Sequence, residues 1–199
     1  MKKQKNMMSI SGLVFGEVQF GNLNTDKEQK VRKRLLDIEN YCSMIDEAEG
    51  FSEIWKIVRD TVKSCLGKQR LGMLLFLDDL PLHLGAYHQL GTNNIVLNRS
   101  LVNIVRDFTK SRKLTNAFVY SILTHEYLHA LGHVSETEVR ALVHDISKRC
   151  FGEDHIVTIL AAKTPWSLLE GIPLHGVRVS TQPMELIKNL EKPNQSYII

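Results

Sequence analysis

Apolar residues recur every three or four positions along most of the chain, which is the spacing of an amphipathic helix. One such stripe follows Thr25 and Glu28, a pair that fits a helix-starting capping box. A second predicted helix begins near Ser52 and ends at Gly67. Six later helices are predicted at 101–108, 114–131 and 139–150, from Asp154, from Thr164-Pro165 to Gly171, and from Pro183.

The pattern changes between residues 67 and 101. The run from Leu71 to Leu77 is short and apolar and indicates a buried strand, and Ile95 to Leu97 indicates another. The segment 78–94 between them is rich in turn residues. We therefore expect a helix-rich α+β fold with a small sheet, in one domain spanning 25–192. Residues 1–24 are expected to form an arm or strand, and residues 193–199 a tail.

Composition excludes several classes of protein. The 199 residues suit one domain, and the net charge of +3 is too small to indicate a nucleic-acid partner. No apolar run approaches the roughly 20 residues of a membrane span. Cys42, Cys65 and Cys150 lie far apart in the sequence, so neither a disulfide framework nor a thiolate metal site is indicated, and we expect a cytoplasmic protein.

The predicted helix at 114–131 contains the sequence His125-Glu126-Tyr127-Leu128-His129, an H-E-x-x-H motif. In a helix, residues four apart project from one face about 6 Å apart along the axis, so both imidazoles can bind one ion. Glu126 lies beside them, where its carboxylate could accept a proton from a metal-bound water. The motif therefore predicts a zinc site with Glu126 as the general base.

Two histidines do not complete such a site, because catalytic zinc usually has three protein ligands and one water. His155 ranks first as the third ligand, because a histidine at the start of an adjoining helix could fold back over the motif. Glu136 ranks second, since Ser135 and Glu138 fit a capping box that leaves Glu136 free. The remaining candidates are Glu138, His133 and His144.

Residues 125–133, H-E-Y-L-H-A-L-G-H, resemble the active-site helix of zincin-type zinc metallopeptidases, and the whole chain is similar to small archaeal proteins with this motif. Gly132 stands where the metzincin branch has its turn glycine, but Ser135 occupies the position of that branch's third ligand. The resemblance is therefore to a gluzincin-like or divergent zincin. It implies that His125 and His129 bind Zn²⁺, that Glu126 acts as base and then proton donor, and that the strand at 95–97 pairs with an extended peptide.

The leading hypothesis is a zinc metallopeptidase that hydrolyses peptide bonds in a peptide or protein substrate. A metal-dependent RNA hydrolase is one alternative, because a bacterial ribonuclease family has a similar run that ends in a third histidine where this chain has Ser135. A regulatory or binding protein with structural zinc is another. Glu126 favours hydrolysis, since it has no expected role as a ligand. Tyr87 and His88 are candidates for stabilising an oxyanion.

Overall fold

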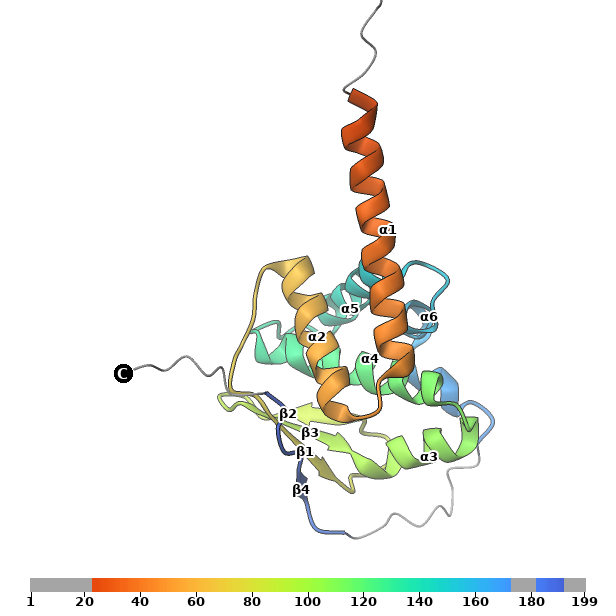
Figure 1. Cartoon of the computed structure of the whole chain (residues 1–199). Helices are drawn as coiled ribbons and strands as arrows, with labels where there is room; N and C mark the ends of the chain where they lie inside the picture. The colour runs from red at the N-terminus through yellow and green to blue at the C-terminus, as the bar shows by residue number, and fades with distance from the viewer. Residues whose placement is uncertain (1–22, 173–181, 192–199) are drawn as a thin grey trace, which may run out of the picture. The chain divides into compact units, whose positions relative to one another are not determined.

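The computed structural model describes residues 23–172 and 182–191 (Figure 1). The arm or strand predicted before residue 23 and the tail predicted after residue 192 lie outside these residues. The chain divides into two compact units after Arg34. The described part of the first unit is the beginning of α1 (Leu23–Glu47), and the second unit contains the sheet and the other helices.

The described residues form the predicted α+β fold, with helices in the majority. After α1 come α2 (Phe51–Leu66), α3 (Arg99–Thr109), α4 (Arg112–Ala130), α5 (Glu136–Phe151), α6 (Ile156–Lys163) and the 3₁₀ helix η1 (Pro165–Leu169). Among the described residues, none of these helices has the length and apolar character needed to cross a membrane.

Local signals explain most of these boundaries. Gly67 ends α2 in the left-handed conformation, with φ of 66°. The Ser111 and Ser135 side chains accept hydrogen bonds from backbone amides at the starts of α4 and α5. Helix α6 is capped by His155 and not by the predicted Asp154. The helix predicted from Pro183 was wrong, because a short strand begins two residues later.

The sheet has four strands in the order β2-β3-β1-β4. They are β1 (Leu74–Asp78), β2 (Ala86–His88), β3 (Asn94–Asn98) and β4 (Glu185–Leu186). Strand β3 runs parallel to β1 and antiparallel to β2, and β4 is antiparallel to β1. The segment 78–94, predicted as turns, thus contains an edge strand. Because both sides of β3 are paired, the prediction that its residues 95–97 bind a peptide was wrong.

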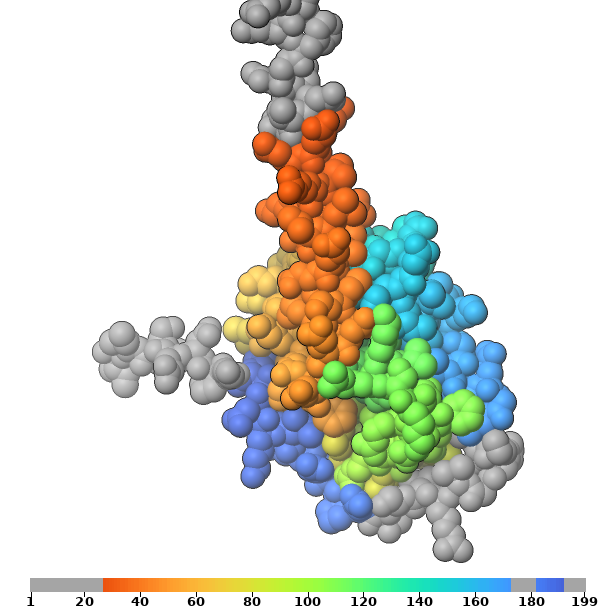
Figure 2. Space-filling model, turned by 45° about the vertical axis from the view of Figure 1, so that its right-hand side comes forward, coloured from red at the N-terminus to blue at the C-terminus, as the bar shows by residue number. Residues whose placement is uncertain are grey.

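Helix α4 lies at the centre of the second unit. It packs against α2, α3, α5 and α6 and against strands β2 and β3 (Figure 1). Helix α3 also lies beside η1, where the green and blue surfaces meet in Figure 2. In the core, the Tyr120 hydroxyl of α4 lies 2.8 Å from the Thr61 hydroxyl of α2. Cys65 and Cys150 are also neighbours, as free thiols with their sulfur atoms 3.5 Å apart.

Arg70 attaches the end of α4 to the loop before β3. Its guanidinium donates hydrogen bonds to the carbonyl oxygens of Ala130 and Thr92, at 2.7 and 2.9 Å, and to the side chain of Asn93 at 2.8 Å. Its backbone amide donates to the hydroxyl of Tyr127, at 2.7 Å. The last turn of α4 is therefore held in place by bonds from outside the helix.

Candidate metal centre

The H-E-x-x-H motif occupies the last turns of α4. Its polar residues are the part of the helix between Thr115 and Ala130 that reaches the surface. Every residue from Thr115 to Ala130 is buried, except His125, Glu126 and His129, which are partly exposed. A helix buried on all sides ordinarily carries apolar residues throughout. These three polar side chains therefore face a specific opening between the packed elements.

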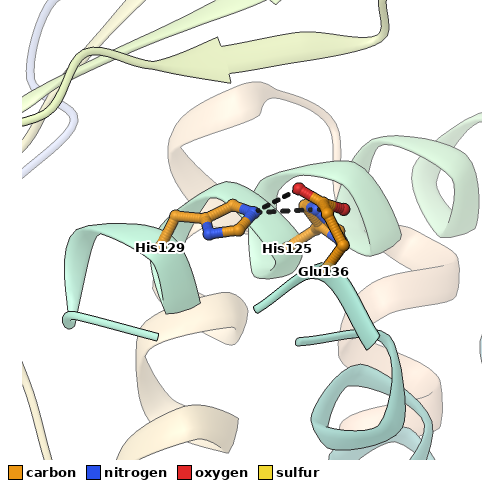
Figure 3. A group of neighbouring side chains, drawn as sticks. All are labelled: His125, His129 and Glu136. Carbon is orange, nitrogen blue, oxygen red and sulfur yellow. Dashed lines mark hydrogen bonds and ion pairs between the residues drawn. The ribbon is translucent and has the colours of Figure 1, made fainter. Parts of the chain in front are cut away.

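Glu136 meets the two histidines at this opening (Figure 3). The Nε2 atoms of His125 and His129 are 3.1 Å apart. Glu136 places Oε2 at 3.2 Å from Nε2 of His125 and Oε1 at 3.1 Å from Nε2 of His129. Within the described ranges, this is the group of three metal-ligating side chains whose ligand atoms all come within 4.8 Å of one another.

The three separations fit the size of a zinc site. Ligand atoms at roughly 2.0–2.1 Å from a tetrahedral zinc ion lie about 3.3–3.4 Å from one another. The two Nε2 atoms are 3.1 Å apart, and Oε2 and Oε1 of Glu136 lie 3.2 and 3.1 Å from Nε2 of His125 and His129, so each of these distances is within about 0.3 Å of that value. Two imidazoles and one glutamate, with a fourth position left for water, are also a known ligand set of catalytic zinc. The donor atoms therefore suit zinc in both kind and spacing.

The turn between α4 and α5 brings Glu136 to the histidines. Gly132 has a φ of 98°, which a residue with a side chain rarely adopts, and it lets the chain reverse direction directly after α4. Ser135 then caps α5 by accepting a hydrogen bond from the Glu138 amide at 3.3 Å. Glu136 is the first residue of α5 and faces back towards α4.

His129 has a second contact that determines which of its nitrogens can bind a metal. Its Nδ1 lies 2.7 Å from the carbonyl oxygen of His133. A carbonyl oxygen can only accept, so Nδ1 carries the proton and donates it. Nε2, which faces His125 and Glu136, therefore keeps its lone pair in the neutral ring. Such an outer hydrogen bond is usual for histidines that bind metals.

The structure places His155, which ranked first as third ligand, elsewhere. Its Nδ1 accepts a hydrogen bond from the Val157 amide, and its Nε2 lies 3.2 Å from Oδ1 of Asp46. The ring stacks on Phe151, with centroids 5.4 Å apart. Both nitrogens thus have partners outside the cluster, and the structure brings Glu136, not His155, to the two histidines.

The remaining candidates also lie outside the cluster. His133 and Glu138 pair with each other, with Nδ1 and Oε1 2.7 Å apart. His144 lines the cavity described below but is not one of the three clustered residues.

The surroundings change the acidity of the motif residues. Burial lowers the pKa of His125 below its ordinary value, and the charges of His129 and Arg140 lower it further, against the effect of Glu136. A lowered pKa keeps the imidazole neutral, which is the form that binds metals. Burial raises the pKa of Glu126 to about 7, although His129 and the backbone amide of His88 act in the opposite direction.

A cavity of about 860 Å³ opens in front of the cluster. It is lined by the three clustered residues and Glu126, by β2 and the segment before it, and by parts of α5, α6 and η1. Its volume lies in the range of small-molecule and peptide sites. Strand β2, at the edge of the sheet, forms one wall, and Tyr87 and His88 contribute to it.

No protein-family model matches the sequence, and neither the curated proteins nor the solved structures include a significant match.

Proposed function

We propose that the protein is a zinc-dependent metallopeptidase in which His125, His129 and Glu136 bind Zn²⁺. The observation that carries the proposal is the group of ligand atoms at the opening of the cavity: the two Nε2 atoms are 3.1 Å apart, and each lies 3.1–3.2 Å from one oxygen of Glu136. A zinc ion bound there would lower the pKa of a bound water towards 7 and polarise the carbonyl of the scissile bond.

Glu126 is proposed as the general base. It lines the same cavity as the three ligands but is not one of them, so its carboxylate is free for proton transfer. A pKa of about 7 suits a group that accepts a proton from water and then gives it to the leaving amine near neutral pH. This position also favours a catalytic over a purely structural role for the zinc, since a structural site needs no base.

Strand β2 is proposed to align the substrate. Its residues 86–88 pair with β3 on one side, and β2 ends the sheet order on the other. An extended peptide could add to such an edge through backbone hydrogen bonds. Because β2 also lines the cavity, a peptide bound there would pass in front of the cluster.

We place the activity in the cytoplasm, where the three free thiols would stay reduced.

The test combines metal content with peptide cleavage. The purified chain is loaded with zinc, dialysed and analysed by mass spectrometry for bound metal, and is incubated with a peptide library whose products are sequenced. We expect close to one zinc per chain and cleavage of internal peptide bonds. Glu126→Gln should keep the zinc and lose at least about 100-fold in kcat/KM.

Three results would contradict the proposal. The absence of stoichiometric zinc would remove the metal site, and zinc without cleavage would leave only a binding protein. Cleavage of an RNA oligonucleotide, but of no peptide, would assign the same residues to another reaction. Glu138→Gln is the matched control, because Glu138 is an exposed glutamate of α5 that pairs with His133 outside the cluster.

A further inference from the structure

Arg140 lies one helical turn after Glu136 on α5 and lines the same cavity as His125 and Glu126. A glutamate and an arginine at positions i and i+4 of a helix ordinarily attract each other as an ion pair. Here the oxygens of Glu136 lie instead at 3.1–3.2 Å from the two histidines. Within residues 23–172 and 182–191, the Arg140 guanidinium forms no ion pair or hydrogen bond.

Away from the candidate centre, the other charged or basic groups on the cavity wall have the same sign as Arg140 or can acquire it. The acidic residues among the cavity-lining residues are Glu126 and Glu136, and both belong to the candidate centre. The basic residues away from the centre are Arg140, Lys163, His83, His88 and His144. The wall beyond the centre therefore favours an anionic group of the ligand.

Apolar side chains also contribute to the cavity wall. Ile122, Val143 and Trp166 line the same cavity, and Val143 belongs to the α5 turn that follows Arg140. Arg140 is exposed, so its guanidinium can reach a ligand that enters the cavity. Its planar fork can donate two parallel hydrogen bonds to the two carboxylate oxygens.

We propose that Arg140 binds a carboxylate of the substrate, so that preferred peptides have an acidic side chain or a free C-terminus close to the scissile bond. The proposal rests on the peptidase function proposed above and defines its substrate class. The free C-terminus and the Asp or Glu side chain present the same chemical group, and the experiment separates them.

The experiment measures binding, so that it does not depend on turnover. Four dansyl-labelled octapeptides form two matched pairs. In the first pair, one neutral sequence without glutamine ends either in a free carboxylate or in an amide. In the second pair, both peptides are amidated and differ only in having a glutamate or a glutamine at one position. Each is titrated into the Glu126→Gln protein, both zinc-loaded and in EDTA. We expect carboxylate peptides to bind about tenfold or more tightly than their matched amides.

Variants assign this preference to Arg140. Arg140→Met should reduce the preference to less than about twofold and leave the affinity for the neutral amide unchanged, whereas Arg140→Lys should keep part of it. Lys148→Met is the control, because Lys148 lies two turns further along α5, is exposed, and pairs with Glu153 on the surface. It should bind all four peptides like the parent protein.

Several outcomes would overturn the inference. They are equal binding of carboxylate and amide peptides, a preference that survives Arg140→Met, and no measurable binding of any peptide below about 1 mM. A preference that disappears in EDTA but persists in Arg140→Met would assign the carboxylate to the metal. Failure of the proposed function would give a different result. The protein would then bind no zinc and cleave no peptide, but the Arg140-dependent preference for carboxylate peptides would still be measured in EDTA.

Discussion

Oε1 of Glu136 lies 3.1 Å from Nε2 of His129, although the two residues belong to successive helices separated by a turn. The contact depends on that turn, because Glu136 is the first residue of α5 and must face back towards α4. The third ligand of the candidate centre is therefore provided by the element that follows the motif directly.

Glu136→Gln should weaken zinc binding by at least about 100-fold, because a neutral amide is a much poorer ligand than a carboxylate. His155→Ala should leave the affinity within about threefold of the parent value, since the His155 nitrogens contact Asp46 and Val157. Zinc affinity is measured by competition with a chromogenic chelator. Stronger loss in His155→Ala than in Glu136→Gln would contradict the assignment of the third ligand.

Gly132→Ala should reduce zinc affinity and also destabilise the protein. A residue with a side chain at φ of 98° is strained by about 1–3 kcal/mol, and the turn can relieve that strain by moving Glu136 away from the histidines. Urea unfolding and chelator competition measure the two effects. The control is Gly50→Ala, at a glycine with extended backbone and with no atom near the added methyl group. Unchanged zinc affinity in Gly132→Ala would show that the turn does not position Glu136.

In metal-free protein, the contribution of Glu126 to stability should decrease as the pH rises from about 5 to 8. Its folded pKa of about 7 lies above the ordinary value of 4.5, so the folded state retains a proton that the unfolded state has lost. The stabilising effect of the retained proton is complete at low pH and disappears as the pH passes through 7. The shift corresponds to about 3 kcal/mol as an order of magnitude.

Glu126→Gln isolates this contribution, because the amide does not titrate. In EDTA, the difference in unfolding free energy between Glu126→Gln and the parent should grow in favour of the variant between pH 5 and pH 8. Urea titrations at a series of pH values measure it. Parallel curves for the two proteins would mean that Glu126 has an ordinary pKa and is not the base with a raised pKa that we propose.

The hydroxyl contact between Tyr120 and Thr61 tests the packing of α4 on α2. Tyr120→Phe should cost about 1–3 kcal/mol, because it leaves the buried Thr61 hydroxyl with fewer partners. The double variant Tyr120→Phe/Thr61→Val should lose less unfolding free energy than the two single variants together, since both partners of the contact are removed. Urea unfolding of the four proteins measures the coupling, and additive effects would contradict the contact.

Much of the helical framework was predictable, because long amphipathic segments carry a periodic signal. The segment 114–131 forms α4, and the Gly67 stop ends α2, as predicted. Short elements carry too few residues for such a pattern. Strand β2 has three residues within a turn-rich segment, and β4 has two after Pro183. Each forms because a neighbouring antiparallel strand provides backbone partners: β3 pairs with β2, and β1, which is distant in the sequence, pairs with β4.

The site was predictable only in part, for a related reason. The spacing of His125 and His129 is a local property of one helix, whereas the third ligand depends on the direction in which the chain leaves it. The capping pair Ser135 and Glu138 was the useful signal, since it left Glu136 free at the helix start. Arg140 was missed. Its place four residues after Glu136 puts it on the same face of α5, and that spacing could have identified it.

Complete saturation mutagenesis of α4 should separate its positions into two classes. Between Thr115 and Ala130, thirteen of the sixteen positions face the interior, and changes there should be detected as loss of soluble, protease-resistant protein. His125, Glu126 and His129 should instead accept many replacements without loss of folded protein. A screen that scores abundance alone would therefore rate the three positions of the helix to which we assign the chemistry as its most tolerant ones.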